Sequence, residues 1–236
     1  MSLYDTLADF DDRVFRNITS LRISADLFDD LVPDARAQAA AVAADLRMRP
    51  WPPGVIPRGL KYSEAIGYPF ASDKTVASRY GDGTLRVWYG ALDAATSVAE
   101  TCWHQLRQLQ AIEGIDVPVT RYRAMYQVRA RGLFLELRGK EDRYPELLDD
   151  DYAATQAVAK HAAAQGLQGL LYPSSRWPEG SCLAAFRSEP LSDPVLMYYL
   201  TYRIDAVAGT VTIERTPGVV EQVLHVRDLQ RERAVQ

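Results

Sequence analysis

An arginine, a tyrosine and a carboxylate lie close together in the segment Ser78–His104, as Arg79, Tyr89 and Glu100. A second arginine, Arg58, precedes this segment. Arginine suits the recognition of a diphosphate because its planar guanidinium can donate two parallel hydrogen bonds. The segment is short enough for its side chains to line a single ligand site.

Each of these residues also has an ordinary structural interpretation. A helix glutamate such as Glu100 is most often solvated, a strand tyrosine such as Tyr89 usually packs in a core, and Arg79 by default lies at the surface. Ser174 and Ser175 follow Tyr-Pro at the end of an apolar run, where serine commonly forms a turn. Position alone leaves both interpretations open.

Other kinds of catalytic centre have less support in the sequence. No serine stands in a glycine-x-serine-x-glycine nucleophile elbow, which argues against a hydrolytic triad. The three histidines, His104, His161 and His225, show no metal-ligand spacing with one another or with the cysteines, so we expect no metal site. The glycine-rich fingerprints of dinucleotide- and phosphate-binding loops are missing from the sequence as well.

A strand, a sharp connection and a helix are expected to position these residues. Leu85–Ala91 is rich in strand-forming residues, and Asp93 is a suitable N-cap for a helix that ends near Ile112. On that helix Glu100 lies away from the apolar stripe and beside Trp103. Glu100 therefore acts in chemistry only if this second face of the helix lines a cleft.

Most of the remaining chain is expected to form strands. We expect them at Tyr122–Ala130, Phe134–Leu137, Gly169–Pro173, Cys182–Phe186, Val195–Ile204 and Thr210–Glu214, with a helix at Tyr152–Gln165. Tyr122–Ala130 alternates residue by residue, which predicts one buried and one exposed face. Because strands cluster instead of alternating with helices, the pattern favours an α+β fold.

The N-terminal part of the chain is expected to differ from the rest. Residues 3–48 are interpreted as helical, above all the alanine-rich Ala35–Met48. The proline-rich Arg49–Pro57 cannot continue a helix. The sequence thus predicts an N-terminal helical extension and linker over residues 1–54, and the main domain over residues 55–236.

Composition argues against several classes of protein. The net charge of −4 disfavours a protein that binds nucleic acid through bulk positive charge. No stretch approaches the roughly 20 apolar residues that span a membrane, and no secretory signal is visible at the N-terminus. The two cysteines show no paired spacing. We expect a cytoplasmic protein that binds neither membrane nor nucleic acid directly.

Two stretches, in this order, resemble the RES domain, a family named for an arginine, a glutamate and a serine. They are RYGDG…VWYGALDAATSVAE and GLLYPSSRWPEGSCLAAF, and the resemblance covers about residues 55–190. Its most specific features are the spacing from Tyr89 to Glu100 and the strand that ends in Tyr-Pro-Ser. The resemblance implies a fold similar to that of ADP-ribosyltransferases, with a mixed sheet core and helices.

The resemblance also implies an activity and a partner. RES domains are toxins of bacterial toxin–antitoxin systems that break the nicotinamide–ribose bond of NAD, by hydrolysis or phosphorolysis, or that modify a protein. NAD is then the substrate, and no separate cofactor is expected. A helix-turn-helix antitoxin blocks the site. The N-terminal extension is open to three roles: antitoxin binding, formation of a homodimer, or covering of the site.

Carried over residue by residue, the family's glutamate is Glu100, its tyrosine is Tyr89 and its serine is Ser174. The resemblance implies that Glu100 stabilises the oxocarbenium-like charge on the ribose. Tyr89 would orient the nicotinamide ring, and Ser174 would fix its amide or the ribose. Ser175 is the adjacent alternative to Ser174.

Arg58 and Arg79 stand where family members carry two arginines, and the resemblance implies that they hold the diphosphate. Tyr80, next to Arg79, is expected to contact NAD as well. Two other functions stay open: a mono-ADP-ribosyltransferase acting on a protein or nucleic acid, and a non-enzymatic interaction module in which these residues only pack a core.

Overall fold

The computed structural model describes residues 2–20, 63–71 and 77–229. The strands are β1 (Leu7–Thr19), β2 (Trp88–Ala91), β3 (Val119–Glu136), β4 (Gly169–Pro173), β5 (Ser181–Ala185), β6 (Leu191–Asp205), β7 (Thr210–Thr216) and β8 (Val219–His225). The helices are α4 (Tyr68–Ala71), α5 (Ala94–Gln110) and α6 (Ala153–Ala164), with short helical turns η1 (Ser63–Gly67), η2 (Pro145–Leu147) and η3 (Val226–Leu229).

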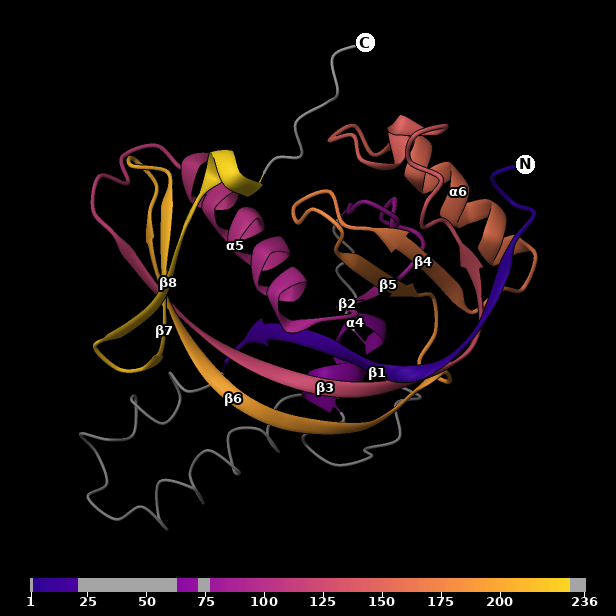
Figure 1. Ribbon diagram of the computed structural model, residues 1–236, viewed down its shortest axis with the longest axis horizontal. Coiled ribbons are helices and arrows are strands. Elements are labelled where there is room, and N and C mark those ends of the chain that lie inside the picture. The colour runs from indigo at the N-terminus through magenta and orange to yellow at the C-terminus, as the bar shows by residue number, and fades with distance from the viewer. Residues whose placement is uncertain (1, 21–62, 72–76, 230–236) are drawn as a thin grey trace.

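The strands form one mixed sheet in the order β1-β2-β5-β4-β3-β6-β7-β8. An additional pairing of β1 with β3 closes the strands from β1 to β3 in that order into a ring. In Figure 1, β1, β3 and β6 run as long curved strands, α5 lies on their concave side, and α6 lies beside β4. This architecture confirms the predicted α+β class.

Residues 7–19 correct the prediction for the N-terminus, because they form a strand and not a helix. β1 pairs antiparallel with β3 along its whole length, and it buries the side chains of Val14 and Asn17. Cross-strand pairing and burial thus make this segment a strand, although its local sequence was interpreted as helical. The rest of the predicted extension and its linker fall within residues 21–62, outside the described residues.

β3 joins two strands that the sequence predicted separately, and its middle is buried on both faces. Ala124 and Tyr126 face one core cluster, as the alternation predicted. Arg123 and Met125 on the opposite face are also buried, with 6% and 0% exposure. The prediction of one exposed face is wrong here because α5 covers that face, and its apolar side chains share a core cluster with Met125.

β4 and β5 are buried on both faces. In β4, Leu170 and Tyr172 belong to one core cluster and Leu171 to another. Strands that are buried on both faces are typically predicted from continuous apolar runs. The sequence predicted β4 and β5 close to their observed bounds. The chain therefore leaves β4 from a firmly packed position, and Ser174 is the first residue beyond it.

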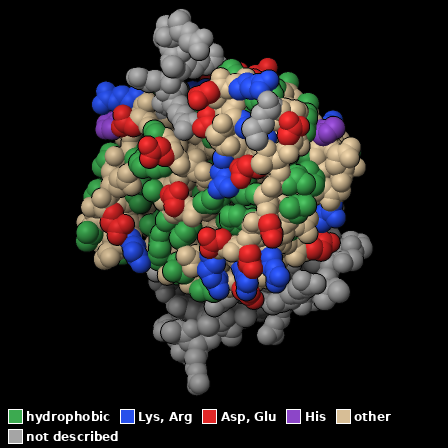
Figure 2. Space-filling view, turned by 45° about the vertical axis from the view of Figure 1, so that its right-hand side comes forward, with side chains coloured by type: hydrophobic (Ala, Val, Ile, Leu, Met, Phe, Trp, Pro, Cys, Tyr) green, Lys and Arg blue, Asp and Glu red, His purple; other side chains and the backbone are tan. Residues whose placement is uncertain are grey.

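Other elements agree with the prediction except at their ends and at the C-terminal edge of the sheet. β2 is shorter than the predicted Leu85–Ala91, and β6 begins earlier than the predicted Val195. β8 was not predicted, because most of its side chains are exposed and show no alternation of burial. Figure 2 shows acidic and basic side chains interspersed over one face of the molecule, in keeping with the small net charge of −4.

Candidate functional site

A hydrogen bond joins the serine and the glutamate that the sequence singled out. The Ser174 hydroxyl, which is fully buried, donates to Oε1 of Glu100 at 2.6 Å. The same hydroxyl oxygen accepts the backbone N–H groups of Arg176 and Trp177, each at 3.1 Å. Because those two bonds occupy the oxygen, its proton is directed at the Glu100 carboxylate.

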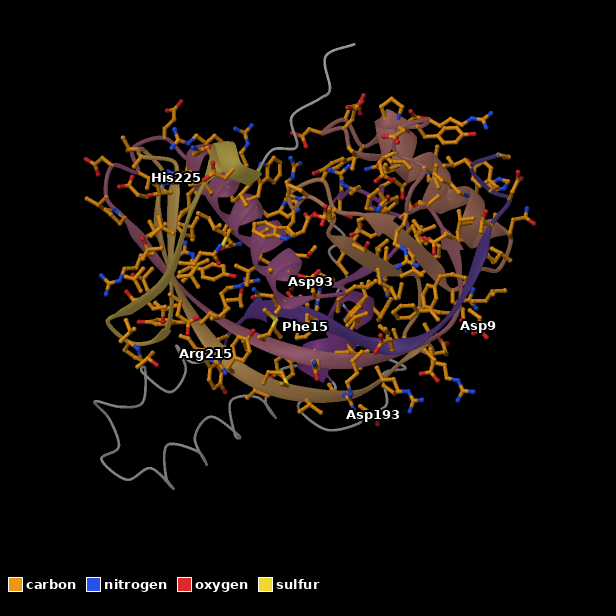
Figure 3. The ribbon with its side chains drawn as sticks, viewed as in Figure 1. Asp9, Phe15, Asp93, Asp193, Arg215 and His225 are labelled. Carbon is orange, nitrogen blue, oxygen red and sulfur yellow. The ribbon has the colours of Figure 1, made fainter. Side chains whose placement is uncertain are left out.

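α5 presents Glu100 to the turn that follows β4. The helix begins as predicted: Asp93 Oδ1 accepts the Thr96 N–H at 2.7 Å, which is an N-cap. Figure 3 shows Asp93 at the start of α5, where the helix comes close to Phe15 of β1. The face around Glu100 is partly packed, since Trp103 is 6% exposed and the Glu100 side chain 20%.

The turn after β4 is fitted tightly against α5. A Cβ atom on Gly180 would lie 2.5 Å from Thr96 Oγ1, so only glycine allows this approach. The preceding residue, Glu179, has a φ of 61°, in the left-handed region that side chains other than those of glycine rarely adopt. Backbone strain of this kind persists only where contacts with the surrounding structure stabilise it, and it is common at functional sites.

Arg79 is buried beside this turn, and the second serine holds it. Its Nη2 donates to Ser175 Oγ at 2.7 Å, and its Nη1 donates to the carbonyls of Leu147 at 3.0 Å and Asp149 at 2.8 Å. The ring of Tyr152 lies 4.9 Å from its Cζ. Most of the donors of Arg79 are therefore used within the protein.

Tyr89 acts on the backbone next to Arg79. Its hydroxyl accepts the Tyr80 N–H at 3.0 Å and shares a hydrogen bond with Ser78 Oγ at 2.8 Å. Burial raises the pKa of Tyr89 to about 12, so the hydroxyl is neutral at physiological pH. From α6, Thr155 Oγ1 donates to the Arg79 carbonyl at 2.5 Å. Tyr89 and α6 together fix the turn that carries the arginine.

Tyr80 is fully buried, and its ring meets the Tyr172 ring edge-on with centroids 4.6 Å apart. Burial raises the pKa of Tyr80 above its ordinary value. Its hydroxyl has no hydrogen-bond partner among the described residues. Arg58, the remaining predicted contact, lies outside the described residues. The structure thus brings together Arg79, Glu100 and Ser174 with the turn that Tyr89 supports.

The sequence did not single out two further members of this cluster, Arg176 and Asp150. The Arg176 side chain is 4% exposed, and its Cζ lies 3.3 Å from the centroid of the Trp103 ring. Its Nη2 donates to Oδ1 of Asp150. Arg176 had a signal in the sequence, because it is an arginine two residues after the predicted site residue Ser174. Asp150 left no signal, since it stands in a run of three aspartates.

His104 follows Glu100 by one helical turn on α5. Its Nε2 lies 3.9 Å from Oε2 of Glu100. Burial lowers the pKa of His104 below 6.5, Glu100 and Asp150 oppose that change, and Arg176 and Arg79 add to it. The protonation of His104 thus depends on both carboxylates and both arginines.

The comparison with protein families agrees with this arrangement. A family model of the RES domain matches residues 49–205, which is more than half of the chain, so the chain belongs to the RES-domain family. RES domains are associated with NAD-utilising, ADP-ribosyltransferase-like proteins. No curated protein matches the chain. β1 precedes the matched residues and yet pairs with β3 inside them.

Residues 2–20, 63–71 and 77–229 contain neither a membrane-spanning helix nor a cluster of metal-binding side chains. None of the helices found there is long and apolar enough to cross a membrane. The same residues contain no group of three or more His, Cys, Asp or Glu side chains arranged to hold a metal ion.

Proposed function

We propose that this protein cleaves the bond between nicotinamide and ribose in NAD. The observation that carries the proposal is the Glu100 carboxylate, which is held by the buried Ser174 hydroxyl and remains partly exposed. Membership of a family associated with NAD use supports the choice of substrate. Arg79 and Arg176 both face the Asp150 carboxylate, and guanidinium groups suit a diphosphate.

Cleavage of the nicotinamide–ribose bond is favoured by a carboxylate whose position is fixed before the reaction. Cleavage of this N-glycosidic bond builds positive charge on the ribose, as in glycoside hydrolysis. A preorganised negative group stabilises that charge without having to reorient. The bonding electrons leave with nicotinamide and neutralise its ring, so no strong general acid is needed. Water then forms the new bond to the ribose carbon and releases a proton.

The experiment measures nicotinamide and ADP-ribose released from NAD by the purified chain. Glu100→Gln keeps the shape of the side chain and removes its charge, so turnover should fall by about a hundredfold or more. Glu113→Gln is the matched control, because Glu113 is exposed beyond the end of α5. Absence of turnover in the wild type, or equal turnover in Glu100→Gln, would show that the proposal is wrong.

Two additions to the assay identify the group that receives the ribose. Phosphate in the buffer distinguishes phosphorolysis, which yields ADP-ribose 1-phosphate, from hydrolysis. Labelled NAD incubated with cell extract detects mono-ADP-ribosyl transfer, because the label then appears on macromolecules.

We also propose that this activity makes the chain a toxin that a helix-turn-helix antitoxin neutralises. Expression of the wild type alone should then stop growth and lower cellular NAD, whereas Glu100→Gln at equal protein level should not. Growth should return when a helix-turn-helix protein encoded beside the chain is expressed with it. Normal growth and NAD on expression of the wild type would contradict this role.

A further inference from the structure

We infer that Arg176 is an anion-binding residue of the site, and that the Asp150 carboxylate occupies its binding position until a phosphate-bearing ligand displaces it. The inference rests on the proposed function for the identity of that ligand, a dinucleotide diphosphate. The contacts that carry it are independent of any bond cleavage.

Arg176 is a buried cation with unused hydrogen-bonding capacity. Its side chain is 4% exposed, and the Trp103 ring supports its guanidinium at 3.3 Å. Among the described residues, neither Arg176 Nε nor the indole Nε1 of Trp103 has a hydrogen-bond partner. A buried donor without an acceptor is costly. Each residue of the pair therefore has one donor for which the described protein supplies no acceptor.

Asp150 presents the chemistry of such an acceptor. Its Oδ1 accepts a hydrogen bond from Arg176 Nη2 and lies 3.9 Å from Arg79 Nη2, so one oxygen faces both guanidinium groups. The Asp150 side chain is 56% exposed, in contrast to the two arginines. Carboxylate and phosphate oxygens form the same kind of hydrogen bond with arginine. An incoming phosphate can thus replace this carboxylate from the solvent side.

Arg79 holds the segment that carries Asp150. Its Nη1 binds the carbonyls of Leu147 and Asp149, just ahead of Asp150 in the chain. Because these bonds and the one to Ser175 use most of its donors, Arg79 has less to offer a ligand than Arg176 has. Asp150 gives the two arginines one shared counter-charge, whereas a doubly charged diphosphate offers a negative charge to each of them.

The sign of the effect of Asp150→Asn tests the inference. If Asp150 only holds Arg176 in place, loss of its charge weakens ligand binding or leaves it unchanged. If Asp150 competes with the ligand, loss of its charge strengthens binding, because less free energy is spent on displacing the side chain. Asp151→Asn is the matched control. It removes the same charge one residue away, and asparagine can still accept the Ala153 N–H that Asp151 Oδ1 accepts at 3.1 Å.

The measurement is calorimetric titration of the full chain with ADP and, separately, with adenosine. We expect Asp150→Asn to bind ADP about five- to tenfold more tightly than the wild type. Arg176→Gln should bind ADP about tenfold more weakly. Asp151→Asn should match the wild type, and the affinity for adenosine should not change in any variant.

The inference is overturned if Asp150→Asn binds ADP no more tightly than the wild type does. It is also overturned if Asp151→Asn or adenosine shows the same gain, or if no variant binds ADP. Should Arg176→Gln fail to fold by circular dichroism, the exposed Asp150 variant still decides. Tighter ADP binding by Asp150→Asn in a protein that does not cleave NAD would leave this inference standing and overturn the proposed function.

Discussion

Ser174 donates a hydrogen bond to Glu100 Oε1 across 2.6 Å, and its neighbour Ser175 accepts one from Arg79 Nη2 at 2.7 Å. Two adjacent residues of one turn therefore hold the carboxylate and the arginine of the site separately. Both serines are buried, with 0% and 3% exposure, so the two contacts are shielded from water. A hydrogen bond to a charged group is stronger when it is shielded in this way.

Separate contacts predict separate kinetic effects. Ser174→Ala removes a hydrogen bond to a charged group, worth about 1.5–3 kcal/mol, so kcat for NAD cleavage should fall about ten- to hundredfold. Ser175→Ala loosens Arg79 and should act mainly by raising KM. Steady-state kinetics of the two variants checks this. Equal effects on kcat and KM in both variants would contradict it.

The close packing of Gly180 against α5 predicts that Gly180→Ala lowers the free energy of unfolding and that Thr96→Ala partly restores it. In Gly180→Ala the new Cβ would meet Thr96 Oγ1 at 2.5 Å, so the free energy of unfolding should fall by about 1–3 kcal/mol. Adding Thr96→Ala removes the two closest atoms, Thr96 Oγ1 and Cγ2, and the double variant should lose less than the sum of the two single changes. Urea unfolding of the four proteins measures this. If the losses of the two single variants simply add up in the double variant, the contact with Thr96 is not what excludes a side chain at position 180.

Hydrogen bonds of the Asn17 side chain join β1 to β3 and β6, so their loss should lower the stability of the fold. Its side chain donates to Tyr202 Oη at 2.7 Å and accepts from Arg123 Nε at 2.9 Å. Asn17→Leu leaves Arg123 Nε without its acceptor and removes one of the two hydrogen bonds of Tyr202 Oη, which should cost about 2–4 kcal/mol of unfolding free energy. Thr19→Ala, which removes one contact of Arg123 at an exposed residue, should cost less than about 1 kcal/mol. Urea unfolding that shows equal losses would contradict this.

Buried tyrosines predict a loss of stability at alkaline pH. Burial raises the pKa of Tyr89 to about 12 and raises those of Tyr172 and Tyr202 above their ordinary value of 10. The folded state thus favours the neutral form, and this contribution is complete below pH 10 and is lost as pH rises toward 12. Unfolding free energies measured between pH 9 and 11.5 should therefore fall.

Ultraviolet titration of the tyrosines provides the companion measurement. The folded chain should ionise fewer than its 13 tyrosines before it unfolds. The signal that appears before unfolding should come from tyrosines other than the buried Tyr89, Tyr172 and Tyr202. Tyr89→Phe should leave that signal unchanged. Early ionisation of all 13 would contradict the burial.

The site was predictable where local rules apply. Asp93 as an N-cap, the helix that carries Glu100, and the strand before Ser174 follow from capping preferences and hydrophobic pattern, and the structure has them. The partners of these residues were not predictable. The sequence suggested that Glu100 could be solvated, and only packing places it against the Ser174 hydroxyl.

By itself the sequence determined the α+β class, most of the strands and the family to which the chain belongs, because periodicity and motif spacing are properties of neighbouring residues. The tertiary structure decided that residues 7–19 form a strand, that Arg123 is buried, and that Arg176 meets Asp150. These outcomes depend on which strands pair and which loops they bring together. The free energy of contacts between residues far apart in the sequence overrides local propensity, and this contribution cannot be predicted from a short stretch of sequence.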